Sequence, residues 1–473
     1  MGDESSGQAD ATRGARSVPA DAIPAPQRKL WRVGTLAYTF GGLVILFSWL
    51  LWGDFAWSMR DRAVAPVVQM LVKKYGASDT VMGLLLSSLP LGISAILGPI
   101  ISYRSDRHRG RWGRRIPYIL VATPVAALAM AGLAFSQPIA DLVRGILGSQ
   151  WLTGVNLTLI VFGVFWTCFE FAAIIAGSVF GALINDVVPS SLLGRFYGLF
   201  RVLSLLAGIL FNYWLIGQAE EHSQWLFGGI AILYGVGVMM MCLMVKEGQY
   251  APPPDVKPGE RKSVFAITKV YFQECFSKPY YLWVFLGLTF GGISFWPINL
   301  FSVPFANSMG VNMEKYGKYS ALSYVISLCL AYFLGVLVDR FHALRVSIIA
   351  LLLYAIAMMA GLFYVTAPAR FAVGWVVHCV LSGVYYTTSA SLAQRLLPRS
   401  TFAQFNSAAG LVGAAIGMVM SPSIGGILDW SGHQYRYTFL MGSGIAVFAA
   451  ILLLIVHSRF MRYGGPKNYV APE

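Results

Sequence analysis

The sequence predicts an all-α membrane protein with twelve transmembrane helices in two similar halves of six. Only 12% of its 473 residues are charged and 57% are hydrophobic, whereas a soluble domain carries about 25% charged residues. Apolar runs long enough to cross a bilayer recur along the whole chain. One polar stretch, 246–278, divides these runs into two sets.

Each set contains six apolar segments close to the ~20 residues that a helix needs to cross the bilayer. The stretch between the sets contains "YAPPPDVKPGERK", a proline-rich sequence typical of a flexible connection. We expect a disordered cytoplasmic tail at 1–33, a half at 34–245, a cytoplasmic linker at 246–278, a half at 279–458 and a cytoplasmic tail at 459–473. The predicted spans are 34–58, 80–103, 116–136, 157–184, 195–216, 224–245, 280–307, 317–338, 346–366, 370–394, 402–424 and 437–458.

The distribution of lysine and arginine predicts the orientation of these spans. If both termini lie on one side of the membrane, that side carries 26 of the 35 basic residues and the other side carries the remaining nine. Because basic residues accumulate on cytoplasmic loops, we expect both termini in the cytoplasm and the protein in the cell's inner membrane. The net charge of +14 follows from this topology and gives no support for nucleic-acid binding.

The sequence lacks the motifs of several other classes of protein. The first 30 residues contain no apolar core, so no cleavable signal peptide is expected. The five cysteines show no metal-ligand spacing, and no nucleotide-binding P-loop occurs. We therefore expect no cofactor, no disulfide and no ATP-driven transport.

The two predicted halves repeat each other at their loops. "LINDVVPSSLLGRFYG" after the fourth span resembles "LAQRLLPRSTFAQFNS" after the tenth, which aligns Pro189 with Pro398. Asp106-Arg107 after the second span corresponds to Asp339-Arg340 after the eighth. A longer outer loop, 135–158, accounts for the extra length of the first half. Such repeats are common in secondary transporters and favour a transporter over a receptor or an enzyme.

The loop after the second span carries a family resemblance. "SDRHRGRWGRRIPYIL" resembles the signature of the major facilitator superfamily, in the version found in the glycoside–pentoside–hexuronide:cation symporters and the related sucrose transporters. Ser102 replaces the glycine of that signature, although Gly335 keeps it in the second half. The loop is also similar to the light-harvesting assembly proteins, a related branch that handles pigment.

The resemblance implies a latch that closes the cytoplasmic side of the protein. Its residues would be Asp106, Arg107 and Arg114, with Asp339 and Arg340 in the second half. Physical reasoning places the Asp106 carboxylate near the positive N-terminus of a neighbouring helix and close to an arginine. The alternative is that the basic residues of this loop only anchor the chain at the lipid headgroups.

Ionisable groups at membrane depth are costly and usually functional. Glu170 lies in the middle of "VFGVFWTCFEFAAIIAG", with Trp166 one turn earlier on the same face. A carboxylate beside an aromatic ring suits a sugar, and the alternative is a protonated glutamate bonded between helices. Asp54 is expected in the outer half of the first span, where it either lines the cavity or ends the helix. Arg60 and Arg62 are expected at the outer gate or surface, and Arg201 either shares a polar stripe or reaches the cytoplasmic headgroups.

The second half offers two further polar and aromatic stripes. Trp375, His378 and Tyr385 recur at helical spacing, and the alternative for this stripe is helix packing. Trp296 and Asn299 share a face of the seventh span. The family resemblance implies that spans one, four, seven and ten line the central cavity.

Together these patterns predict a secondary transporter that works as a monomer in the lipid bilayer. We expect proton- or sodium-coupled symport of a sugar or glycoside by alternating access, with Glu170 as the first coupling candidate and Asp54 as the second. The alternatives are a pigment-handling assembly protein of the same superfamily and an exporter of amphipathic compounds. Substrate, coupling ion and direction are not fixed by the sequence.

Overall fold

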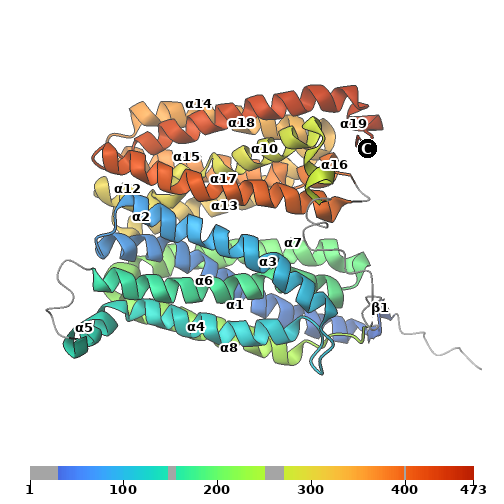
Figure 1. The fold of residues 1–473 in the computed structure, drawn as a ribbon, viewed down its shortest axis with the longest axis horizontal. Coiled ribbons are helices and arrows are strands. Elements are labelled where there is room, and N and C mark those ends of the chain that lie inside the picture. Colours follow the sequence, from blue (N-terminus) through green and yellow to red (C-terminus); the bar gives the residue numbers. More distant parts are fainter. Residues whose placement is uncertain (1–29, 148–155, 251–270, 399–400, 473) are drawn as a thin grey trace, which may run out of the picture.

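The computed structural model describes residues 30–147, 156–250, 271–398 and 401–472. The chain forms two stacked helix bundles, an N-terminal half in blue to green and a C-terminal half in yellow to red (Figure 1). The long helices run in one general direction, so the molecule has two ends. We name the end that carries β1 (Trp31–Val33) and the C-terminus the tail end, and the opposite end, which carries α5 (Ser136–Leu147), the α5 end.

The N-terminal half contains seven further α-helices and several short turns of other helical types within the described residues. They are α1 (Phe40–Lys74), α2 (Asp79–Gly83), the π-helical turn η1 (Leu84–Ser88), α3 (Leu89–Arg107), α4 (Ile116–Ala134), α6 (Leu157–Val187), η3 (Ser190–Leu192), α7 (Leu193–Leu210), η4 (Phe211–Leu215), η5 (Ile216–Gln218) and α8 (Ala219–Met244).

The C-terminal half has the same general plan. Its helices are α10 (Pro279–Ile293), α11 (Trp296–Leu300), α12 (Ser302–Ser308), α13 (Met313–Phe341), α14 (Ala343–Tyr364), α15 (Pro368–Ser389), α16 (Leu392–Leu396), α17 (Phe402–Trp430), α18 (Tyr437–Arg462) and α19 (Gly465–Asn468).

The described residues contain twelve membrane crossings, which confirms the predicted fold class. Eleven continuous helical stretches are long and apolar enough to cross a membrane. One of them, Ser190–Met244, has 55 residues and would extend for about 80 Å, far beyond the ~30 Å hydrocarbon core. Its backbone leaves helical geometry at His222, in the first turn of α8, so the stretch contains two crossings, one formed by α7 and η4 and one by the rest of α8; α7 and α8 both pack against α1.

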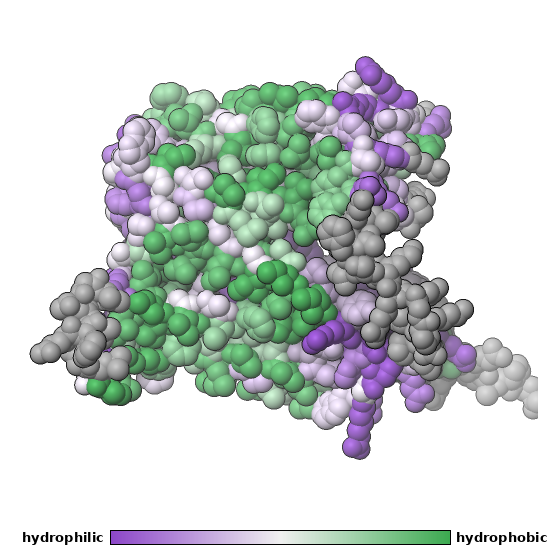
Figure 2. Space-filling model, in the orientation of Figure 1, coloured by the Kyte–Doolittle hydropathy of each residue, from purple (hydrophilic) through white to green (hydrophobic). Residues whose placement is uncertain are grey.

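The surface agrees with a protein embedded in a bilayer. Figure 2 shows apolar side chains across the middle of the molecule and hydrophilic ones gathered at its two ends, most densely at the tail end. The first described element, β1, and the C-terminus lie at that same end (Figure 1), as an even number of crossings requires. Residues 1–29 and 251–270, which include most of the predicted tail and linker, lie outside the described residues.

The start of the first span differs from the sequence prediction. Residues 31–38 form a hairpin of β1 and β2 (Leu36–Tyr38), with Gly34 at a positive φ of 54° in its two-residue turn. Thr39 then caps α1 by accepting a hydrogen bond from Gly42 N–H. The helix runs unbroken to Lys74, so its centre lies near Trp57 rather than near residue 46. This shift decides where the charged residues of α1 lie.

The predicted outer loop 135–158 also contains a helix, α5, so its description as a loop was incomplete. The exposed apolar side chains of α5 include Leu142 and Ile146. A helix with such a face fits the boundary between lipid and water rather than an extended loop.

Two irregular helices shape the interior of the molecule. The seventh crossing is broken into α10, α11 and α12, and Pro297 and Pro304 lie near these breaks. The second crossing contains the π-helical turn η1. Such irregular turns free backbone carbonyls from the helical ladder, and side chains from other helices bind them.

Candidate functional site

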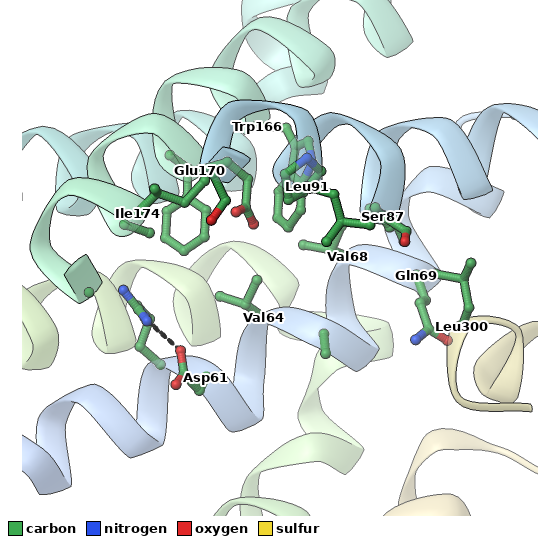
Figure 3. A pocket seen from close by; sticks show the side chains of 18 of the residues that line it. Asp61, Val64, Val68, Gln69, Ser87, Leu91, Trp166, Glu170, Ile174 and Leu300 are labelled. Atoms are coloured by element: carbon green, nitrogen blue, oxygen red, sulfur yellow. Dashed lines mark hydrogen bonds and ion pairs between the residues drawn. The ribbon is translucent and has the colours of Figure 1, made fainter. Parts of the chain in front are cut away.

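A cavity of about 820 Å³ lies in the N-terminal half and reaches the C-terminal half at α11 (Figure 3). Four structural units line it: α1, the second crossing (η1 and α3), α6 and α11. Its lining is mainly apolar, with a few charged and amide groups. Those groups are Arg60, Asp61, Gln69, Glu170 and Asn299.

Glu170 and Trp166 lie side by side on α6, as the sequence predicts, and both line this cavity (Figure 3). Trp166 Nε1 donates a hydrogen bond of 2.7 Å to the carbonyl oxygen of Leu85 in η1, so the π-helical turn fixes the indole ring. Among the described residues, no side chain forms a hydrogen bond or an ion pair with the Glu170 carboxylate. The structure therefore contains no interhelical hydrogen bond at Glu170 of the kind that a purely packing role requires.

Arg60 lines the same cavity as Glu170 and is 4% exposed. Its guanidinium pairs with Asp61 and lies 4.3 Å from the ring centre of Trp57 and 4.8 Å from that of Tyr234. The expectation of an outer gate or surface position for Arg60 was wrong, because α1 extends to Lys74 and places this residue about 5 Å from the helix centre.

A second cavity of about 410 Å³ adjoins the first and shares Asp61, Gln69 and Asn299 with it. It is lined by side chains from α1, α7, η4, α11, α12, α13 and α15. Hydroxyl, amide and guanidinium groups are prominent in this lining. They belong to Arg62, Arg201, Asn212, Ser302, Tyr316, Ser320, Ser323, Tyr324 and Ser382.

The predicted residues of the C-terminal half divide into two groups. Trp296 and Asn299 line the first cavity, and Asn299 and Trp375 line the second. Trp375 Nε1 donates to Ser320 Oγ over 2.9 Å. His378 lies behind the cavity wall and is fully buried, while Tyr385 is 2% exposed and packs on Phe295.

His378 supports the wall of the cavities. Its Nε2 lies 2.9 Å from Asn299 Oδ1 and its Nδ1 lies 3.0 Å from the Tyr354 hydroxyl. A neutral imidazole with the proton on Nε2 satisfies both contacts, because Nε2 then donates and Nδ1 accepts. The expectation that His378 and Tyr385 face a substrate therefore needs correction: the stripe on α15 continues from the cavity wall into the core.

Asp54 also differs from its expected position. Because α1 begins at Phe40, Asp54 lies in the half of the helix nearer the tail end, not in the outer half. It is 1% exposed and lines neither cavity. Its neighbours Gly53 and Ala56 pack closely against Met241 and Gly237 of α8.

Gln69 closes the cavities toward the α5 end. Its Nε2 donates to the Asn299 carbonyl over 3.0 Å, and its Oε1 accepts from Val303 N–H over 3.2 Å. The break between α11 and α12 provides both backbone groups. One amide side chain of the N-terminal half thus binds the broken helix of the C-terminal half.

A second set of contacts joins the halves at the extreme α5 end. The Asp429 carboxylate accepts hydrogen bonds from Asp79 N–H and Thr80 N–H, each of 2.8 Å, and from Thr80 Oγ1, at 2.6 Å. The fully buried Asp79 carboxylate binds Lys73 of its own half, at 2.5 Å, and His433 of the other half, at 2.7 Å. The two halves are therefore closed against each other at this end.

The predicted latch residues lie at the tail end, and their partners belong to their own half. Asp106 pairs with Arg115, and Arg114 pairs with Asp186 at 2.5 Å, which raises the pKa of Arg114. Arg107 lies over the Tyr103 ring at 3.9 Å. In the second half, Asp339 lies 3.4 Å from Arg395, and Arg340 lies 5.4 Å from the ring centre of Phe341.

The helix N-terminus in this region binds a different carboxylate from the expected one. Glu247, just after α8, accepts hydrogen bonds of 2.7–2.9 Å from the N–H groups of Arg114, Arg115 and Ile116 at the start of α4. The expectation that Asp106 occupies such a position was wrong. An acidic residue directly after the sixth span was the available signal.

Twelve crossings in two halves around two adjoining cavities define a membrane transporter, not an enzyme. The chain matches the MFS/sugar transport protein family over residues 50–401 and belongs to that family. Mouse solute carrier family 45 member 4 is 28% identical over 222 residues, which is 44% of this chain and 26% of that protein. The aligned region thus spans about a quarter of the relative.

Solved transporter structures share the fold at low sequence identity. A D-xylose-proton symporter has a TM-score of 0.60 at 15% identity and covers 87% of this chain and 96% of its own. An inward-facing bacterial homolog of the human lysosomal transporter Spinster has a TM-score of 0.62 at 16% identity, with 91% and 99% covered. A nucleoside transporter, NupG, reaches 0.65 at 12% identity, with 87% and 99% covered.

Proposed function

We propose that the protein is a cation-coupled symporter of a sugar or glycoside and that Glu170 carries the coupling charge. The observation that carries this proposal is the Glu170 carboxylate, which faces the larger cavity at the middle of α6 and has no partner among the described residues. The family description and the D-xylose-proton symporter among the similar structures support the substrate class.

The chemistry of a carboxylate at this depth suits ion coupling. Low dielectric disfavours the ionised form, so the group tends to hold a proton or to need a cation beside it. Arg60 lines the same cavity, but its guanidinium is already paired with Asp61. A proton or cation that enters the cavity from one side of the membrane or the other could therefore bind at Glu170.

The lining of the two cavities favours a polyhydroxylated substrate over a pigment. Trp166 and Trp375 contribute the edges of largely buried indole rings to the lining, and hydroxyl and amide groups surround the smaller cavity. A wholly apolar pigment would offer no partner to the charged side chains of Arg62 and Arg201, which line the smaller cavity, and this costs free energy. Such a penalty would select against apolar ligands.

Transport would follow from rocking of the two halves about this midplane site. In this proposal the tail end faces the cytoplasm, in the inner membrane, and the excess of basic residues at that end supports this orientation. Rocking would then break the contacts of Gln69 and Asp429 and open the cavities to the other side.

The test is concentrative uptake and equilibrium exchange by Glu170→Gln in the same proteoliposomes. Glutamine keeps the shape of the side chain and removes its titration. We expect uphill accumulation under an imposed proton or sodium gradient to be lost, while exchange at equal concentrations partly survives. Glu221→Gln, an exposed site on α8, is the matched control and should retain both activities. Full accumulation by Glu170→Gln would refute the proposal.

A further inference from the structure

Two arginines in the smaller cavity form a feature that the proposed coupling at Glu170 does not use. Arg62 extends from α1 and Arg201 from α7, and both line this cavity. Arg62 Nη2 lies 3.4 Å from Ser204, which follows Arg201 by one helical turn on α7, so the two like charges lie on the same part of the cavity wall. Arg201 is exposed to the cavity, although its helix crosses the membrane.

The contacts of Arg62 position its guanidinium without neutralising it. Its Nη1 donates to the Tyr324 hydroxyl over 2.9 Å, and its Nη2 lies 3.4 Å from Ser204 Oγ. The guanidinium also lies 4.7 Å from the centre of the Tyr324 ring. These partners are uncharged, and a guanidinium has five N–H donors, so donors remain for a ligand.

No described carboxylate lies within ion-pair distance of Arg62 or Arg201. The acidic residue that lines the same cavity, Asp61, is paired with Arg60. Two like charges at membrane depth without a counter-charge are costly. An anion that enters between them would relieve both the repulsion and the missing pairing.

We propose that Arg62 and Arg201 form an anion-binding subsite that holds a carboxylate or phosphate group of the transported substrate. Guanidinium groups bind both kinds of anion through paired charge-assisted hydrogen bonds. Ser320, Tyr316 and Trp375, which line the same cavity from the C-terminal half, would contact the rest of the same molecule. This inference rests on the proposed sugar site and narrows its substrate to an acidic sugar derivative.

Binding to purified protein in detergent tests the subsite without any requirement for ion coupling. The probes are D-glucose, D-glucuronate and D-glucose 6-phosphate, and the readout is the dissociation constant from calorimetry. We expect at least one acidic probe to bind about tenfold or more tightly than glucose. The carboxylate and the phosphate probes distinguish the two sources of negative charge.

Variants of Arg201 provide the decisive comparison. Arg201→Gln should weaken binding of the acidic probe about 10- to 100-fold, as expected for a lost charge-assisted contact, and should leave glucose binding unchanged. Arg201→Lys keeps the charge but not the planar fork, so an intermediate loss is expected. Arg195→Gln, on the exposed first turn of α7, is the matched control and should bind like the parent.

Three results would overturn the subsite. They are equal affinity for glucose and the acidic probes, undiminished binding of the acidic probe by Arg201→Gln, and no measurable binding of either acidic probe at millimolar concentration. If glucose binds and the acidic probes bind no more tightly than glucose, the anion subsite is refuted but the sugar-transport proposal is not. Loss of coupling at Glu170 would not alter these binding measurements, so the two proposals fail separately.

Discussion

Replacing Asp429 with asparagine should weaken the closure of the two halves at the α5 end. Its carboxylate accepts three hydrogen bonds from Asp79 and Thr80, which lie 350 and 349 positions away in the sequence. Asp79 and Thr80 are the first residues of α2, so the negative charge also meets the positive end of that helix. Asparagine keeps one acceptor oxygen and loses the charge.

The structure sets the size of this effect. A hydrogen bond to a charged group contributes about 1.5–3 kcal/mol and a neutral one about 0.5–1.5 kcal/mol. Asp429 is 25% exposed, so we take the lower part of the range and expect a loss of about 2 kcal/mol. That loss corresponds to a roughly 30-fold rise in the ratio of open to closed molecules at this end. The contacts of His433, Tyr435 and Ser421 with the other half remain, so full opening is not expected.

Spin-label distances across the α5 end would measure the shift. Labels on cysteines introduced at the exposed positions Lys74 and Gln434 report the separation of the halves in a background without the five native cysteines. The parent should show mainly a short distance, and Asp429→Asn should add a longer population. Asp141→Asn, on the exposed surface of α5, is the control. An unchanged distance distribution in Asp429→Asn would show that these bonds do not hold the end closed.

Two further predictions concern backbone geometry and pH. Gly425→Ala should open the α5 end in the same spin-label assay, because the added Cβ would clash with the backbone of Asp79. In the control Gly426→Ala, the added Cβ makes only an ordinary van der Waals contact, so this variant should behave like the parent. Equal behaviour of the two variants would contradict this reasoning. Burial, followed by the charges of two nearby arginines, lowers the pKa of His342 to about 4, and its Nδ1 accepts a hydrogen bond from Leu344 N–H. The folded state therefore binds fewer protons than the unfolded state, so His342 should reduce thermal stability as pH falls from about 6.5 to 4. Asparagine tolerates the positive φ of 72° at this position and can cap α14. The His342→Asn variant should therefore lose less melting temperature than the parent over that pH range. An identical pH profile of melting temperature in the two proteins would refute this role of His342.

The fold could be predicted from the sequence because each crossing is a local property of about 20 residues. Glu170 and Trp166 were also visible, since a carboxylate within a long apolar run has few structural explanations. The positions of Arg60 and Arg62 were not, because they depend on where α1 begins. The hairpin at residues 31–38 moves that start to Phe40, and the helix continues to Lys74, so residues expected outside the membrane lie near its middle.

Contacts between distant segments could not be predicted from the sequence alone. The bonds between Asp79 and Asp429 form only when the two halves meet, and no local pattern marks either residue. Glu247 was hidden for another reason: its role depends on the fold of a loop that brings it to the N-terminus of α4. The family motif drew attention to Asp106, whereas the carboxylate that binds the N-terminus of α4 belongs to Glu247, which lies outside the motif.

The division of cavity residues between the halves links binding to the opening of the transporter. A ligand shifts a conformational equilibrium only through a difference in its affinity for the two states. Trp166 and Glu170 belong to one half, and Trp375 and Ser320 to the other, so rocking changes their separation and the affinity of any substrate that contacts both. Asn299 lines both cavities, with its carbonyl bound to Gln69 and its side chain held by His378. A substrate that binds Asn299 therefore contacts the group that closes the cavities, and its binding energy acts directly on the closed state.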